Sequence, residues 1–187
     1  QVPMIVDCHV NIWNDEDVGR AWHERVGIAR KAEIPAKADA DTLFRELAEV
    51  DQAIVFGLKV RESLGIEVDD ATTAAAVAKY PDKFIGFACV NPTYPDALES
   101  LRHAHQTLGL RGVKMTPLYM NFHLADHRAQ PIYDYCQRNN LPITLHMGTG
   151  LGHPCPLDYG RPLHVDAVAL QYPELKLVMA HMGHPWE

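Results

Sequence analysis

The segment QPIYDYCQRNNLPITLHMG, residues 130–148, contains a helical stretch followed by a short apolar run that ends in a histidine. Pro131 falls in the first turn of the helix predicted over 130–139, which is a favoured place for proline. The run ITLH, residues 143–146, is typical of a buried strand. The segment therefore predicts one helix–strand unit of an α/β protein.

The same alternation of apolar runs and helical stretches extends along the whole chain. Further strands are predicted at residues 4–7, 53–56, 84–90, 112–115 and 175–181. Further helices are predicted at residues 41–50, 69–79, 96–108 and 163–171. Six strands with continuous apolar runs indicate a parallel sheet that is covered by helices.

Two α/β architectures fit this pattern, a doubly wound open sheet and part of a (β/α)8 TIM barrel. No GxGxxG turn follows the first strand, so a nucleotide-binding open sheet lacks its usual support. A complete barrel takes about 250 residues. The 187-residue chain is therefore predicted to hold about six βα units of a barrel, as one incomplete domain over residues 1–187.

Composition and charge argue against several classes of binding partner and of functional site. The net charge of -7 and the lack of a basic run argue against nucleic acid and anionic membranes as partners. No apolar run reaches a membrane-spanning length, and we expect a cytoplasmic protein. Without a CxxC pair, paired-thiolate zinc and redox sites are excluded, and buried free thiols are predicted for Cys8, Cys89, Cys136 and Cys155.

Polar side chains recur at the carboxyl ends of the predicted strands. His9 and Asn11 end the first strand, Lys114 the fourth, His146 the fifth and His181 the sixth. In βα barrels the loops at this rim converge on the central axis and build the active site. Neutral imidazoles that converge there suit zinc, iron or manganese. The alternative is that the three histidines are separate core residues.

The first strand carries a polar face. In DCHVN, residues 7–11, the side chains of Asp7, His9 and Asn11 alternate with apolar neighbours and would share one face of an extended strand. Asp7 lies deeper and is predicted to orient a histidine. Asn11 offers an amide oxygen, which is a weaker ligand than imidazole and favours harder cations. The alternatives for Asn11 are a hydrogen bond to metal-bound water, or a site that has lost its metal.

A family resemblance rests on the order of five motifs. These are DCHVN (7–11), YPDKFIGFACVNP (80–92), LGLRGVKM (108–115), LPITLHMGTG (141–150) and YPELKLVMAHMGHPW (172–186). Their order resembles the amidohydrolase-related family, which includes aminocarboxymuconate-semialdehyde decarboxylase-like enzymes and predicted metal-dependent hydrolases of TIM-barrel fold.

The resemblance implies a mononuclear zinc or manganese site. In that family the ligands are an HxH pair on the first strand, a His on the fifth, sometimes a His on the sixth and an Asp on the eighth. His9, His146 and His181 match this set, and Asn11 replaces the second histidine of the HxH pair. The Asp of strand eight has no counterpart in the 187 residues. We therefore expect strands seven and eight to lie in further sequence.

Other polar and aromatic residues have weaker claims to the site. Lys114 is predicted to bind a substrate carboxylate; the alternatives are a snorkelling lysine or, as in other branches of the superfamily, a carbamylated one. Trp13 and Trp186 are candidates to stack on a substrate, or simply pack. Arg161 is a candidate carboxylate partner or a surface residue. His184 is a candidate acid–base group. His153 is a weaker acid–base candidate. His103 and His105 are expected to be solvated, and His123 and His127 are expected to be loop residues.

Metal-centred chemistry is the mechanism that the sequence supports. The first hypothesis is a hydrolase in which metal-activated water attacks an ester, lactone or amide of a small carboxylated substrate, with His181 or His184 stabilising the oxyanion. The second is a non-oxidative decarboxylase of an aromatic or unsaturated acid, with Lys114 or Arg161 holding the substrate. The third is an inactive or binding-only barrel fragment. Zinc is the expected ion, with manganese or iron as alternatives, and a homodimer is expected from the resemblance alone.

Overall fold

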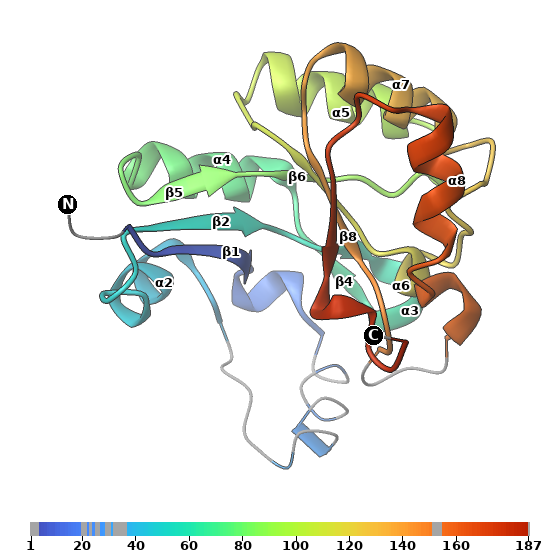
Figure 1. The fold of residues 1–187 in the computed structure, drawn as a ribbon. Coiled ribbons are helices and arrows are strands. Elements are labelled where there is room, and N and C mark those ends of the chain that lie inside the picture. Colours follow the sequence, from blue (N-terminus) through green and yellow to red (C-terminus); the bar gives the residue numbers. More distant parts are fainter. Residues whose placement is uncertain are drawn as a thin grey trace.

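Parallel strands that follow the order of the chain form the framework of the molecule (Figure 1). The computed structural model describes residues 4–19, 22, 24, 27–28, 31, 37–150 and 155–186. Its parallel strands are β1 Val6–Asn11, β2 Gln52–Phe56, β5 Phe84–Gly86, β6 Ala88–Cys89, β7 Val113–Met115, β8 Ile143–His146 and β9 Leu177–Ala180. They form two sheets, β1-β2-β5 and β6-β7-β8-β9.

The two sheets share one continuous stretch of chain. The Phe87 N–H donates to the carbonyl of Val55 on β2, whereas the next amide, of Ala88, donates to the carbonyl of Gly112 beside β7. β5 and β6 are therefore one strand that changes partner at Phe87, and the predicted six strands are all present. Each strand pairs with the next along the chain, whereas a doubly wound sheet reverses its order at a switch point. The order is that of successive units of a (β/α)8 barrel.

Five longer helices connect or flank these strands and begin and end close to the predicted bounds. They are α2 Ala40–Glu46, α4 Asp70–Lys79, α5 Ala97–Gln106, α7 Gln130–Arg138 and α8 His164–Gln171. Asp39 and Asp69 cap α2 and α4 by accepting hydrogen bonds from the Thr42 and Ala71 amides, both at 2.8 Å. No helix among the described residues is long and apolar enough to cross a membrane.

Several short elements, mostly in the loops after the strands, were not predicted. They are η1 Asp15–Asp17, β3 Lys59–Val60, α3 Arg61–Leu64, β4 Ile66–Glu67, α6 Pro117–Met120, η2 Leu157–Gly160 and η3 His181–Gly183. Each is at most four residues long, which is too short for a helical or strand periodicity to appear in the sequence. β3 and β4 form a small antiparallel hairpin between β2 and α4.

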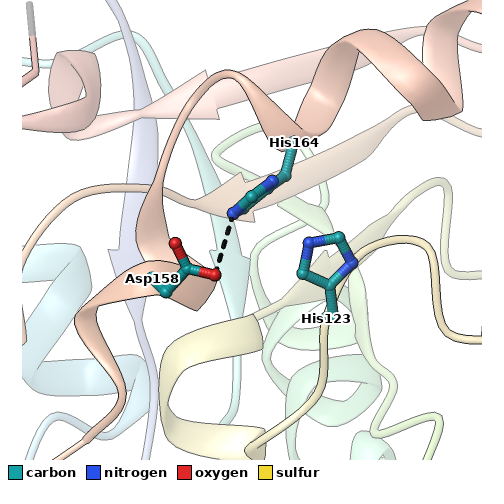
Figure 2. A group of neighbouring side chains, drawn as sticks. All are labelled: His123, Asp158 and His164. Carbon is teal, nitrogen blue, oxygen red and sulfur yellow. Dashed lines mark ion pairs between the residues drawn. The ribbon is translucent and has the colours of Figure 1, made fainter.

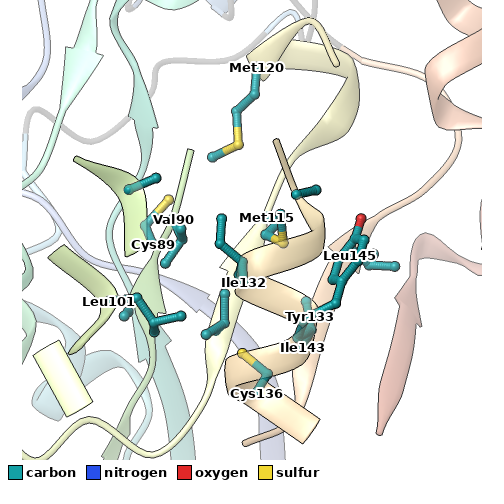
Figure 3. Packing of buried hydrophobic residues seen from close by; sticks show 14 of the residues in the cluster. Cys89, Val90, Leu101, Met115, Met120, Ile132, Tyr133, Cys136, Ile143 and Leu145 are labelled. Atoms are coloured by element: carbon teal, nitrogen blue, oxygen red, sulfur yellow. The ribbon is translucent and has the colours of Figure 1, made fainter. Parts of the chain in front are cut away.

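The larger hydrophobic core lies between the second sheet and its helices, as Figure 3 shows. Leu101 of α5 and Ile132 of α7 pack there against Met115 of β7 and Leu145 of β8. The one phenol drawn in this view, that of Tyr133, is fully buried and donates to the Leu124 carbonyl at 2.9 Å. Its buried hydroxyl is therefore satisfied.

None of the four cysteines forms a disulfide among the described residues, and they are not all buried. Cys89 and Cys136 lie in this core, and burial raises the pKa of each thiol to about 12. Cys155 is half-buried and Cys8 is exposed. The prediction of four buried thiols is therefore confirmed for Cys89 and Cys136 and wrong for Cys155 and Cys8, the latter of which follows Asp7 at an irregular point of β1.

Candidate functional site

A cavity of about 700 Å³ opens at the carboxyl ends of the strands. Much of its polar lining comes from four strands, β1, β7, β8 and β9, and from the residues that directly follow them. These lining residues are His9, Asn11, Lys114, Thr116, Thr144, His146 and His181. The predicted strand-end residues therefore surround one space, because parallel strands all end at the same rim.

β1 reaches this rim through a bulge. Its pairing with β2 shifts between Asp7 and Val10, so that Cys8 and His9 face a single residue of β2. The shift interrupts the predicted alternation: Cys8 joins His9 and Asn11 in the cavity lining, which does not include Asp7. Asp7 Oδ1 accepts a hydrogen bond from the backbone N–H of His9 at 2.9 Å. The carboxylate thus supports the backbone of His9, not the imidazole.

The imidazole rings of three strand ends lie against one another. The ring centroid of His181 is 4.7 Å from that of His9 and 4.6 Å from that of His146. The edge of the Phe56 ring packs on His9 with a centroid distance of 5.0 Å. These contacts join β1, β8 and β9 at one point, and the role of the rings as metal ligands stays a prediction.

Burial keeps this histidine group uncharged. It lowers the pKa of His9 to about 3, with the charge of Lys114 as the next cause, and it lowers the pKa of His146 to about 4. The pKa of His181 is also lowered, again by burial before Lys114. At neutral pH the three rings are therefore neutral, and each has one nitrogen lone pair, as metal binding requires.

Hydrogen bonds determine which nitrogen carries that lone pair in two of the rings. The Thr149 carbonyl lies 3.0 Å from His146 Nε2 and can only accept, so His146 bears its hydrogen on Nε2 and its lone pair on Nδ1. Lys114 Nζ lies 3.4 Å from His9 Nε2, and its protonated form donates there, which places the lone pair of His9 on Nε2. A cation that bound His9 through Nε2 would therefore take the place of this lysine contact.

The side chain of Asn11 bears on whether the cavity could hold a cation. Its Oδ1 atom is buried and has no hydrogen-bond partner in the part of the chain that the structure describes, although the residue lines the cavity. A buried carbonyl oxygen without a partner is costly unless something outside the chain binds it. One amide oxygen and three neutral imidazoles are ligand types that suit a divalent transition ion, although the candidate ligand atoms of the three histidines do not all lie within 4.8 Å of one another.

Lys114 is the most unusual charge at this cavity. Its side chain is almost fully buried, with 1% exposed, and burial lowers the pKa of its amine to about 7. The amine also lies 5.1 Å from the centre of the Phe56 ring. No carboxylate of the described residues forms an ion pair with it. An anionic ligand in the cavity would supply the missing partner.

Four other predicted site residues lie away from the lining of this cavity, as far as the described residues define it. Trp13 packs edge-on against Trp22, and its backbone pairs with Ala38. Arg161 pairs with Asp158 at 3.4 Å. His184 contributes its backbone carbonyl to the Thr149 amide, and Trp186 is 37% exposed. Their proposed roles in substrate binding or proton transfer stay predictions, and His153 lies outside the described residues.

Several lining residues were not anticipated from the sequence. Thr116 and Tyr119 follow β7 in the stretch KMTPLYM, where Pro117 begins the short helix α6. The proline at a helix start was the only available indication of that turn. Leu58 and Leu64 reach the cavity from the β3–β4 hairpin region, which has no sequence periodicity.

The neutral histidines predict an acid-sensitive fold in the metal-free protein. In the unfolded chain these rings bind protons below about pH 6.5. In the folded chain they do so only near the lowered pKa values of about 3 and 4. The free energy of unfolding should therefore fall as the pH drops from 6.5 towards 4. The slope should reach up to about 1.4 kcal/mol per pH unit for His146 and less for the more exposed His9. Urea unfolding with chelator at pH 7, 6 and 5 measures it.

The double variant His9→Gln/His146→Gln provides the comparison for this pH experiment. Its free energy of unfolding should change less between pH 7 and 5 than that of the wild type. Equal slopes in both proteins would show that the two rings are not held neutral.

Comparison with known proteins agrees with this geometry. The sequence matches the family model for amidohydrolases over residues 6–187. The chain belongs to the amidohydrolase family. No curated protein sequence matches it significantly. Amidohydrolases include hydrolases, decarboxylases and hydratases, and they typically bind a divalent metal.

Solved structures share the barrel fold of this amidohydrolase. An uncharacterised TIM-barrel protein from Bordetella bronchiseptica is 24% identical with a TM-score of 0.74, over 98% of this chain and 69% of that one. A probable 2-pyrone-4,6-dicarboxylic acid hydrolase from Acinetobacter baumannii, solved with citric acid, is 18% identical with a TM-score of 0.60, over 96% and 58%. A 2,6-dihydroxybenzoate decarboxylase bound to 2,6-dihydroxybenzoate is 17% identical with a TM-score of 0.67, over 97% and 68%. The chain thus spans 58–69% of the length of these three proteins. The predicted fold class, part of a (β/α)8 TIM barrel, is confirmed.

Proposed function

We propose that this amidohydrolase is a metal-dependent hydrolase that cleaves an ester, lactone or amide of a small carboxylated substrate. The observation that supports it best is the polar lining of the cavity, which brings together three neutral imidazoles in mutual ring contact and the Asn11 amide oxygen, an atom without a hydrogen-bond partner among the described residues. His9, Asn11, His146 and His181 would hold a divalent ion, with zinc the first candidate. Such an ion polarises a carbonyl group and makes water nucleophilic at neutral pH.

The chain's own residues would orient the substrate and handle its charge. Lys114 would bind the substrate carboxylate, since an anion next to its amine favours the protonated form and raises its pKa from about 7. The Thr116 hydroxyl is buried and has no hydrogen-bond partner among the residues that the structure describes, and it would hydrogen-bond to the substrate. His181, at the exposed end of the histidine group, would stabilise charge that develops on the scissile oxygen.

Non-oxidative decarboxylation is the second candidate, and one observation favours it. The buried amine of Lys114 lies at the same cavity as the three imidazoles, so one site offers a carboxylate partner beside the proposed cation site. Two solved structures that share the fold are aromatic acid decarboxylases. A carboxylate held next to the cation site would be positioned to leave as carbon dioxide.

One assay panel separates the two reactions. The zinc- and manganese-loaded protein is incubated with carboxylated lactones and with hydroxybenzoates, while ring opening and carbon dioxide release are followed in parallel. Ring opening alone supports the hydrolase. Carbon dioxide release alone supports the decarboxylase, and turnover of neither class by metal-loaded protein contradicts both.

The variant Asn11→His should raise zinc affinity. Imidazole is a better zinc ligand than an amide oxygen, so the expected gain is roughly tenfold or more. Competition titration against a chromophoric chelator measures the change in Kd. The control is Asn139→His, which places a histidine on the exposed end of α7, far from the cavity. An unchanged Kd in Asn11→His would show that position 11 does not face the ion.

A further inference from the structure

A second group of metal-binding side chains lies outside the cavity lining, in the loops after β7 and β8. His123 follows α6, Asp158 belongs to η2 and His164 is the first residue of α8. Their candidate ligand atoms all lie within 4.8 Å of one another. Figure 2 shows the three side chains pointing toward a common space from three separate stretches of chain. No local sequence pattern indicates the group, because Asp158 is distant from His123 along the chain.

We propose that His123, Asp158 and His164 form a second cation site, which binds a divalent transition ion such as zinc. Two imidazoles and one carboxylate are a donor set that zinc accepts, with a fourth position left for water. None of the three residues lines the cavity of the histidine group, as the described residues define it.

The spacing of two of the ligands already suits zinc. His164 Nε2 lies 3.4 Å from Asp158 Oδ2. Two ligand atoms at zinc distances of about 2.0–2.2 Å in a tetrahedral arrangement are separated by about 3.4 Å. Among the described residues the buried His164 Nε2 atom has this contact with Asp158 but no hydrogen bond, so a cation would satisfy it.

Two neighbouring contacts act against the ion, and both can be tested. His123 Nδ1 accepts a hydrogen bond from the Ala125 amide at 3.0 Å, which leaves the hydrogen on Nε2. Binding a cation through either nitrogen of His123 therefore costs this hydrogen bond, because a cation on Nε2 moves the hydrogen to Nδ1. Arg161 Nη1 lies 3.4 Å from Asp158 Oδ1, so its positive charge opposes a cation at the other carboxylate oxygen.

The backbone holds η2 in a fixed place near β8. The Gly148 amide donates to the Gly160 carbonyl at 2.6 Å, and a Cβ on Gly160 would lie 2.1 Å from the Gly148 carbonyl oxygen. α6, which carries Tyr119 in the cavity lining, packs on η2. An ion at the second site would therefore cross-link the loops behind one wall of the cavity and raise the thermal stability of the protein.

Zinc counting on the full chain tests the proposal. Apo protein is dialysed against buffered zinc chloride, and bound zinc is measured by metal analysis. The wild type should bind one equivalent more than His164→Ala or His123→Ala. The control His127→Ala removes an exposed imidazole in the same loop and should bind as much zinc as the wild type. A zinc-dependent rise in Tm should be present in the wild type and smaller in the two ligand variants.

Two further variants distinguish zinc binding at the second site from zinc binding at the cavity, and from a hydrogen-bonded cluster that binds no zinc. His9→Ala/His146→Ala, which removes two proposed ligands of the cavity, should still bind the second equivalent, so failure of the proposed function would leave this result intact. Arg161→Gln should tighten zinc binding at the second site severalfold, because it removes the opposing charge. Equal zinc counts in the wild type, His123→Ala and His164→Ala would overturn the proposal, as would loss of all zinc from the cavity variant.

Discussion

Replacing His146 by alanine should remove metal from the cavity and nearly abolish turnover. The ring lies at the end of β8, next to His181, and the Thr149 carbonyl fixes its tautomer with the lone pair on Nδ1. Alanine removes a proposed ligand itself, so kcat/KM should fall by more than the roughly 10- to 100-fold typical when a residue that only supports a ligand is lost. Metal analysis and initial rates on the substrate found with the assay panel measure both effects.

The matched control for His146→Ala is His103→Ala. His103 is an exposed histidine on the outer helix α5, so its loss should leave metal content and rate unchanged. Added zinc at high concentration should restore part of the lost rate in His146→Ala, because the other proposed ligands remain. Wild-type zinc content and rate in His146→Ala would contradict the assignment of this cavity as the reactive centre.

The strands were predictable because burial acts on them uniformly. A parallel strand covered on both faces must be apolar along its length, so runs such as AIVF and ITLH are visible without any structure. The residues that follow such runs then lie at one rim, which is why His9, Lys114, His146 and His181 could be grouped from the sequence. The order of the strands in the chain and their parallel direction were therefore enough to predict which residues lie together at the rim.

The finer geometry of the site was not predictable for a physical reason. The bulge of β1 moves Cys8 into the lining and leaves Asp7 on the His9 backbone, and bulges have no reliable sequence pattern. Hydrogen-bond partners such as Thr149 depend on the path of a loop. The grouping of Asp158 with distant histidines likewise follows from the approach of two loops, which no local periodicity records.

A buried ion pair between β3 and α4, next to β6, leads to the second prediction with a large expected effect, which concerns stability. Lys59 Nζ lies 2.6 Å from Asp70 Oδ2, with 13% and 6% of the two side chains exposed. The other oxygen of Asp70 accepts a hydrogen bond from the buried Cys89 amide of β6 at 2.9 Å. One carboxylate therefore neutralises a buried ammonium and also satisfies the backbone of a strand that enters the larger core.

The variant Asp70→Ala should destabilise the fold by about 3–5 kcal/mol, because it leaves a buried ammonium and a buried amide without partners. This is a large part of the 5–15 kcal/mol typical of a folded domain, so urea unfolding should show a strongly lowered midpoint. Lys59→Met/Asp70→Leu should be less destabilised than Asp70→Ala, since it removes the unpaired charge along with its partner. Asp134→Ala, which breaks the exposed pair with Arg138 on α7, should cost no more than about 0.5 kcal/mol. If Asp70→Ala unfolded at the same urea concentration as Asp134→Ala, the Lys59–Asp70 pair would not be buried in solution.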